Sequence, residues 1–305
     1  VPVAYVEQVL IPGILAQDTA TRALSLRANF TWTFVGNVIY SACQWAILIV
    51  LAKIGSTTMV GHFSLGLAVT APVIQLTNLQ LRSLQASDAK NEYRFGHYLG
   101  LRFLTTPIAL VLMIAIVIVS RYSLYVTSVI LAIGLAKSFE SISDAFYWLL
   151  QHHERMDLIA KSMIIKGLVS LSLLGIVVYL TGNVLLGSLA LAVSWLMVLL
   201  CYDIRCGAKV LTVAAPLFAV AQGRTALNFA VLRPIWEWRS LKALVLLSLP
   251  LGIVMMLLSL NDNIPRYFIE RYLGLSQLGI YSAMAYLIVA GTTIVSALGQ
   301  SATPR

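Results

Sequence analysis

The sequence predicts an all-α membrane protein, a polytopic helical bundle of about eight transmembrane helices. Its composition gives the first reason, because 59% of the 305 residues are apolar and only 11% are charged, against about 25% charged residues in soluble domains. Long runs without any Lys, Arg, Asp or Glu give the second. The third is the uneven distribution of basic residues between the loops on the two sides of such a bundle.

The charge-free runs predict the spans in chain order. They are Ala28–Ala52, Ile54–Leu81, Phe103–Ser120, Tyr122–Ala136, Gly167–Tyr202, Ala243–Leu260 and Leu273–Pro304. The fourth run is too short for a span and must take residues from the polar segment after it. The fifth is long enough for two spans, and Thr181-Gly182-Asn183 near its middle is typical of a tight turn. We therefore expect a hairpin there.

The basic residues test this hairpin, because Lys and Arg collect in the short cytoplasmic loops. With eight spans and a cytoplasmic N-terminus, all but four of the 21 basic residues lie inside, the exceptions being Lys53, Arg121, Arg266 and Arg271. A single span in place of the hairpin would divide the basic residues almost evenly. The distribution therefore favours eight spans, and it accounts for the net charge of +9 without a nucleic-acid partner, for which no basic run with exposed aromatics is seen.

Two stretches at opposite ends of the chain resemble each other. They are AKIGSTTMVGHFSLGLAV (Ala52–Val69) and ERYLGLSQLGIYSAMAYL (Glu270–Leu287). Each has Gly-x-aromatic-Ser before a long apolar run, with Gly61 and Gly279 separated by 218 residues (279 − 61). One interpretation is that small residues merely allow close helix contact. The other is an internal repeat in one orientation, with a pseudo-twofold axis along the membrane normal.

The repeat predicts the domain organisation. Residues 1–25 carry acidic residues and lack the basic start of a signal peptide, so we expect a flexible leader. Residues 26–202 would form a first six-helix bundle, and 203–240 a cytoplasmic linker with an interfacial segment rich in Trp and Arg. Residues 241–305 would form the first two helices of a second bundle, so that a complete protein would be longer.

Span four carries the densest group of polar residues. Lys137, Glu140 and Asp144 recur at helical spacing and share one face with Ser141, Trp148 and Gln151. This face could line the cytoplasmic entrance of a cavity, with Glu140 and Asp144 as candidates for taking up a coupling ion. The alternative is a solvated extension of the helix below the membrane.

Other candidates lie on spans one and seven. Asn37, Ser41 and Gln44 share one face of span one, where amides would suit a sugar or bind a neighbouring helix. Lys53, Arg266 and Arg271 lie near the outer mouth and could bind an anionic group or snorkel to phospholipid headgroups. Pro265 before Arg266 favours a broken or tilted helix end.

Four stretches resemble the polysaccharide flippases, the Wzx-type proteins of the multidrug/oligosaccharidyl-lipid/polysaccharide exporter superfamily. They are LRANFTWTFVGNVIYSACQW (Leu26–Trp45), LRSLQASDAKNEYRFGHYLGLR (Leu81–Arg102), LLQHHERMDLIAKSMIIKG (Leu149–Gly167) and LNDNIPRYFIERYLGLSQLGIYSAMAYL (Leu260–Leu287). The resemblance implies alternating-access transport of a lipid-linked glycan across the bacterial cytoplasmic membrane. Membrane lipids and glycan polymerase machinery would be the partners. We expect Arg266 to face the cavity and hold the lipid diphosphate, because a guanidinium can donate two hydrogen bonds to phosphate oxygens.

Two other function classes stay open. A drug or cation antiporter of the same superfamily would want an acidic cavity, but spans one, two, seven and eight have few acids. A membrane glycan polymerase or ligase would need a sizeable outer loop with catalytic groups, and the outer loops are short. No nucleophile–base pair, metal-ligand cluster or phosphate-binding glycine loop is visible in the sequence, so we expect neither an enzyme nor a cofactor. Cys43 lies inside span one, and we expect Cys201 and Cys206, at the cytoplasmic end of span six, to be ordinary buried thiols.

Overall fold

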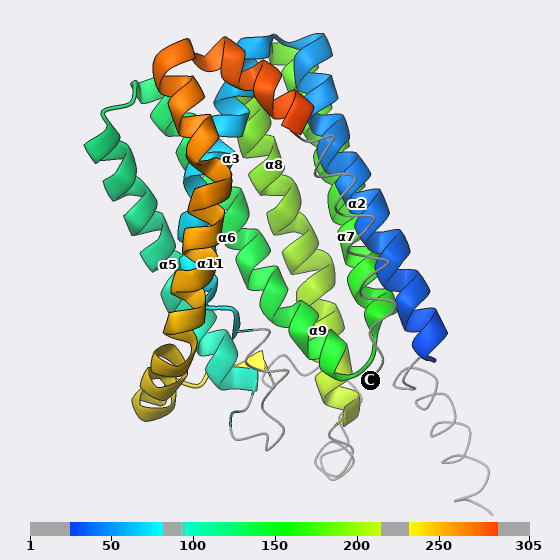
Figure 1. The fold of residues 1–305 in the computed structure, drawn as a ribbon. Coiled ribbons are helices and arrows are strands. Elements are labelled where there is room, and N and C mark those ends of the chain that lie inside the picture. Colours follow the sequence, from blue (N-terminus) through cyan, green and yellow to red (C-terminus); the bar gives the residue numbers. More distant parts are fainter. Residues whose placement is uncertain (1–24, 82–92, 94, 215–231, 286–305) are drawn as a thin grey trace, which may run out of the picture.

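The computed structural model describes residues 25–81, 93, 95–214 and 232–285 (Figure 1). These residues form helices joined by short turns, and no strand occurs among them. Seven of the helices are long and apolar enough to cross a membrane. The predicted fold class, an all-α polytopic membrane bundle, is therefore confirmed.

The helices run alternately up and down the bundle. In chain order they are α2 (Leu26–Ile54), α3 (Thr57–Asn78), α5 (Phe95–Ser120), α6 (Leu124–His152), α7 (Met156–Thr181), α8 (Val184–Val198), the π-helical turn η1 (Leu199–Asp203), α9 (Ile204–Ala214) and α11 (Trp238–Leu273). We call the end at which α2 begins the near end, and the end at which α2 finishes the far end. In Figure 1 the near end is at the bottom.

The turns follow from local sequence. Ser56 and Ser123 accept hydrogen bonds from backbone N–H groups of the first turns of α3 and α6, which satisfies donors that a helix start leaves free. The predicted hairpin is confirmed: α7 ends at Thr181, Gly182 adopts a left-handed φ of 60°, and Asn183 caps α8. A left-handed residue at this position is what glycine tolerates best.

Three helices continue past charged residues that were expected to lie in loops. α5 already begins at Phe95 and includes Arg102, and α7 begins at Met156 and includes Lys166. Both charges are buried and paired inside the bundle, so they do not end a helix. α11 runs through Pro265 to Leu273, so of the two expected forms, a broken or a tilted helix end, the broken one is wrong. The 36 residues of α11 correspond to about 54 Å measured along the helix, more than a hydrocarbon core of about 30 Å requires.

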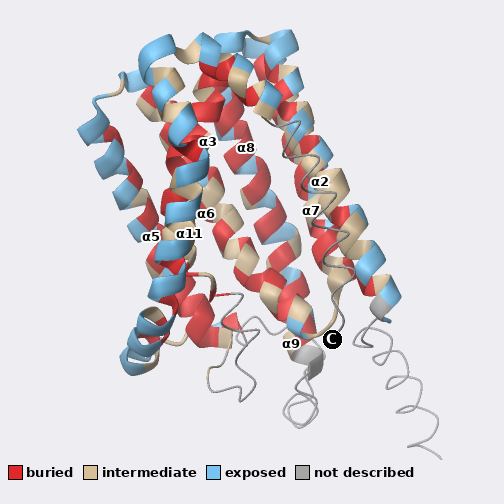
Figure 2. Cartoon of the chain, in the orientation of Figure 1, coloured by how far each residue is buried: buried red, intermediate tan, exposed pale blue. Residues whose placement is uncertain are grey.

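The core lies where the helices face each other, and apolar side chains also cover the outside. α2 packs against α7, α8 packs against α6 and α7, and α3 packs against α6 and α11. Buried residues follow the inward faces in Figure 2, whereas the outward faces of α5 and α11 are largely exposed. Exposed Val111, Ile118 and Leu247 are suitable for contact with lipid.

The two similar stretches meet at the far end. A Cβ on Gly61 would overlap the backbone of Leu275, and a Cβ on Gly279 would overlap the backbone of Thr57. Both pairs obey the same offset, since Leu275 also follows Thr57 by 218 residues (275 − 57). The contact is therefore reciprocal, as a twofold relation requires. Residues 275–285 are helical; the rest of the predicted eighth span, the leader up to residue 24 and linker residues 215–231 lie outside the described residues.

Candidate functional site

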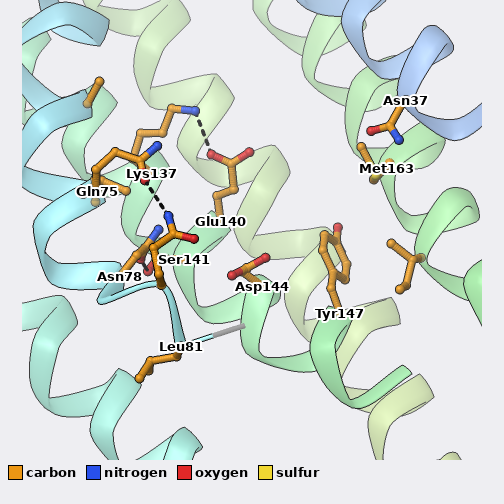
Figure 3. Close-up of a pocket in the computed structure, with 14 residues that line it drawn as sticks. Asn37, Gln75, Asn78, Leu81, Lys137, Glu140, Ser141, Asp144, Tyr147 and Met163 are labelled. Carbon is orange, nitrogen blue, oxygen red and sulfur yellow. Dashed lines mark hydrogen bonds and ion pairs between the residues drawn. The ribbon is translucent and has the colours of Figure 1, made fainter. Parts of the chain in front are cut away.

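A polar cavity of about 460 Å³ lies in the near half of the bundle. Its walls come from α2, α3, α6 and α7, and they include Gln80 and Leu81, which follow α3 at the near end. In Figure 3, Asn37 lies across the cavity from Gln75 and Asn78, with Glu140 and Asp144 between them. The volume is within the range of about 300–1,000 Å³ usual for small-molecule sites.

The polar face of α6 forms one wall, as its spacing predicted. Lys137, Glu140, Ser141 and Asp144 all line the cavity. The next member is Tyr147 rather than the expected Trp148. Trp148 instead stacks on Phe95 with a centroid distance of 6.3 Å and contacts Tyr98, because its ring is needed between α5 and α6.

Lys137 and Glu140 form one ion pair at this wall. Lys137 Nζ lies 2.7 Å from Glu140 Oε2, and the Tyr40 hydroxyl donates to Glu140 Oε1 at 2.9 Å. Lys137 Nζ also lies 5.0 Å from the centre of the Trp195 ring, a cation–π contact. The lysine charge is therefore held by a carboxylate and an aromatic face.

Arg102 lies directly behind the same wall. Its side chain is 2% exposed, and it donates to Ser141 Oγ at 3.1 Å, to Asn78 Oδ1, and to Asp144 Oδ2 at 3.5 Å. Three cavity-lining side chains are thus oriented by one guanidinium, whose planar fork suits several acceptors at once. In the sequence, the position of Arg102 next to a long apolar run was the one indication that its side chain is buried. Its partners could not be predicted, because they are distant in the chain.

A second buried ion pair lies behind Tyr147. Lys166 Nζ is 3.7 Å from Asp203 Oδ2, with both side chains at most 2% exposed. Lys166 also donates to the Tyr147 hydroxyl at 3.0 Å, and Ser162 donates to Asp203 Oδ1 at 2.5 Å. Asp203 ends the π-helical turn η1, a feature common at functional sites. Reasoning from the sequence placed Lys166 in a loop and missed this pair.

The charges around the cavity balance. Its described lining holds one cation, Lys137, and two carboxylates, Glu140 and Asp144, while Arg102 supplies the second positive charge from behind. An anionic substrate such as the lipid diphosphate implied by the resemblance would favour a cationic cavity. The described wall has no positive charge to spare, and amide and hydroxyl groups make up the rest of its polar surface.

The predicted residues of α2 divide between two environments. Asn37 lines the cavity and donates through Nδ2 to the Thr33 carbonyl at 2.9 Å, which leaves its amide oxygen as an acceptor. Ser41 and Gln44 lie closer than Asn37 to the far end of α2. Both are half-buried, and neither lines the cavity. Gln44 Nε2 is buried without a hydrogen-bond partner among the described residues.

The three predicted cations near the outer mouth all lie at the far end and away from this cavity. Lys53 is exposed in the last turn of α2. Arg266 is half-buried on α11 and donates to Asn263 Oδ1 of its own helix. Arg271 is exposed and lines a second pocket. A phosphate-binding role for Arg266 stays a prediction.

Comparison with known proteins gives two matches. The family model described as "Polysaccharide biosynthesis protein" matches residues 26–305. The capsular polysaccharide biosynthesis protein CapF of Staphylococcus aureus is 27% identical over 277 residues, which are 91% of this chain and 65% of that relative. The chain thus spans less than two thirds of the relative's length. No solved structure matches the chain.

Proposed function

We infer the function from one premise: the chain belongs to the polysaccharide biosynthesis protein family, as a multi-pass membrane protein. We propose that it moves a lipid-linked oligosaccharide or polysaccharide repeat unit across the bacterial cytoplasmic membrane. A polyprenyl-diphosphate lipid would carry the sugar, and the route would be alternating access to a cavity between helices.

The polar cavity carries this proposal. A sugar loses its hydrogen bonds to water if it enters hydrocarbon, at a cost of several kcal/mol for each group left unpaired. The cavity offers amides at Asn37, Gln75 and Asn78 and hydroxyls at Ser141 and Tyr147, which can replace that water. Its position within membrane-spanning helices supports transport rather than chemistry on a surface.

The orientation follows the basic residues. Four basic residues belong to segments at the far end: Lys53, Arg121, Arg266 and Arg271. The other basic residues of the predicted loops belong to loops that join helices at the near end. We therefore place the near end, with the N-terminus, in the cytoplasm. The cavity would then receive substrate from the cytoplasmic side.

Individual roles can be assigned to the cavity residues. Asn37 would bind sugar hydroxyls through its free amide oxygen, and Lys137 would contact the phosphate when Glu140 releases it. Glu140 and Asp144 would take up coupling ions, because both are carboxylates that line the cavity and each side chain is 30% exposed. Ser41 and Gln44 would contact substrate as it passes toward the far end.

The test uses the full-length protein in cells that lack their own exporter. Asn37→Leu keeps the size of the side chain but removes its hydrogen-bonding groups, so we expect lipid-linked units to accumulate on the inner leaflet at normal expression. Leu246→Ala, at an exposed apolar position of α11, is the control. Accumulation of single unpolymerised units on the outer leaflet would instead support a glycan polymerase and contradict transport.

A cation antiporter is the second candidate, because two carboxylates line the cavity. Their pairing with Lys137 and Arg102 makes it the weaker one. Resistance to cationic drugs that depends on Asp144, with unchanged glycan export, would favour it.

A further inference from the structure

A second pocket, of about 580 Å³, lies at the far end between the last turn of α5 and the last turns of α11. We call it the far-end pocket. Its lining includes Arg121 and Tyr122 from the turn after α5, and Tyr267, Glu270 and Arg271 from α11. Two arginines from segments distant in sequence thus line one space.

The two arginines differ from the cations near the cavity. Lys137, Arg102 and Lys166 each have a carboxylate within 4.0 Å. Arg121 and Arg271 form no ion pair with any residue of the described ranges. With Glu270 as the acidic member, the far-end pocket has one positive charge in excess. An anion is therefore the ligand that its charge favours.

Arg121 also occupies a strained backbone position. Its φ is 54°, and its N–H donates to the Ile118 carbonyl at 3.3 Å to close the end of α5. Glycine is usual in such a left-handed cap, and another residue there costs about 1 kcal/mol. A guanidinium side chain is thus present at a position where glycine would be less strained.

Aromatic side chains shape the rest of the pocket. The Tyr267 hydroxyl donates to the Ala68 carbonyl at 2.6 Å, which fixes one wall, while Phe268 stacks on Tyr272 at a centroid distance of 6.0 Å. Burial raises the pKa of the Tyr122 hydroxyl, and the negative charge of Glu270 adds to this. Tyr122 therefore stays a neutral hydrogen-bond donor, beside a carboxylate that can accept from a ligand hydroxyl.

We expect the far-end pocket to lie at the level of lipid headgroups. Only about 20 of the 36 residues of α11 are needed to cross a hydrocarbon core, and tyrosines and arginines are typical of the headgroup layer. Phosphate oxygens and hydroxyls are among the polar groups of that layer. Both match the side chains that line the pocket.

We propose that the far-end pocket binds the phosphate of a membrane lipid, with Arg121 and Arg271 donating to the phosphate oxygens and Glu270 accepting from a neighbouring hydroxyl. The phosphate can come from a resident anionic phospholipid or from the polyprenyl diphosphate of a flipped unit. The second source rests on the proposed function, and the first does not. Neither arginine lines the cavity, so the site is separate from it.

The experiment measures lipid binding to the purified full-length protein by native mass spectrometry and by equilibrium titration in detergent. The probes are phosphatidylglycerol, phosphatidylethanolamine, undecaprenyl diphosphate and inorganic phosphate. The test variants are Arg121→Gly, which relieves the backbone strain, Arg271→Ala, and both together. Arg239→Ala, an exposed arginine at the opposite end of α11, is the matched control.

We expect wild type and Arg239→Ala to bind phosphatidylglycerol or undecaprenyl diphosphate in preference to phosphatidylethanolamine. Each arginine removed should weaken the apparent Kd about tenfold, the effect of losing one charge-assisted hydrogen bond. Arg121→Lys with Arg271→Lys should bind at an intermediate level, because lysine keeps the charge but not the fork. Thermal unfolding of the same variants checks that they are folded.

The probes distinguish the sources. Binding of phosphatidylglycerol alone assigns a resident phospholipid, and binding of undecaprenyl diphosphate, with displacement of phosphatidylglycerol, assigns the flipped lipid. Unchanged affinity in the folded double variant, an equal loss in Arg239→Ala, or competition by inorganic phosphate alone overturns the proposal. A protein that binds the lipid here but exports no glycan would contradict the transport function and leave this site standing.

Discussion

Alanine at Gly61 should disrupt the contact between the two similar stretches at the far end. The added Cβ would overlap the Leu275 carbonyl oxygen and lie 2.7 Å from its carbonyl carbon, whereas carbon atoms in contact are about 3.5 Å apart or more. Backbone atoms cannot rotate away as a side chain can. The helix that begins at Leu275 must therefore move by at least about 0.8 Å, and overpacking of this kind costs about 1–3 kcal/mol.

The reciprocal variant supplies a stricter test. A Cβ on Gly279 would lie 3.0 Å from the Thr57 carbonyl carbon, besides overlapping its oxygen, so Gly279→Ala should cost a similar amount. Once one substitution has separated the two segments, the second meets less resistance. We expect the double variant to cost clearly less than the two single costs added together, as neighbouring sites in one interface do.

Two assays report on this contact. The Oγ atoms of Thr57 and Ser276 are 2.7 Å apart, so Thr57→Cys with Ser276→Cys should cross-link under mild oxidation once Cys43, Cys201 and Cys206 are replaced. Gly61→Ala should lower the cross-linking yield and the thermal midpoint.

Gly175→Ala is the control for both measurements. Its Cβ would meet only Val50 at 3.6 Å, and alanine is the better helix former by about 0.5–1 kcal/mol. If Gly61→Ala gave the same yield and midpoint as this control, the reasoning about the far-end contact would be refuted.

Three further predictions concern other parts of the bundle. Lys166→Met should lower the free energy of unfolding by about 3–5 kcal/mol, because it leaves Asp203 buried without its counter-charge. Adding Asp203→Asn should recover most of this loss, as measured by thermal unfolding. An additive loss in the double variant would mean that the pair is not coupled. Glu140→Gln should keep expression but abolish the response of glycan export to an imposed proton gradient in proteoliposomes, and an unchanged response would remove Glu140 from ion coupling. In intact cells a membrane-impermeant thiol reagent should label Thr181→Cys and spare Arg239→Cys, and the reverse pattern would invert the proposed orientation.

Local sequence was sufficient where a local interaction decides the structure. Thr181-Gly182-Asn183 predicted the hairpin because glycine accepts the left-handed cap and the asparagine side chain caps the next helix. The spacing of Lys137, Glu140 and Asp144 predicted one polar face, and all three line the cavity. Helical periodicity is a property of neighbouring residues, so the sequence contains it directly.

The sequence was insufficient where a distant partner decides. The sequence predicts the end of a span at each charged residue, since an unpaired charge in hydrocarbon costs about 2.5–3.5 kcal/mol or more. Arg102 and Lys166 avoid this cost by pairing with Asp144 and Asp203, about 40 residues along the chain. Only the packing of α6 and η1 against their neighbours brings these partners together. The balanced cavity and the far-end pocket were missed for the same reason.

The contact at the far end is compatible with both interpretations of the Gly-x-aromatic-Ser pattern at once. Small residues for close contact and an internal repeat were alternatives, yet Gly61 and Gly279 each admit the backbone of the other stretch. A twofold contact places equivalent residues in equivalent surroundings, so a requirement for glycine on one side is a requirement on the other. The serines follow the same rule: Ser64 and Ser282 are both buried, and neither hydroxyl bonds another described residue. The repeated pattern is therefore what close approach around the predicted pseudo-twofold axis would demand of both copies.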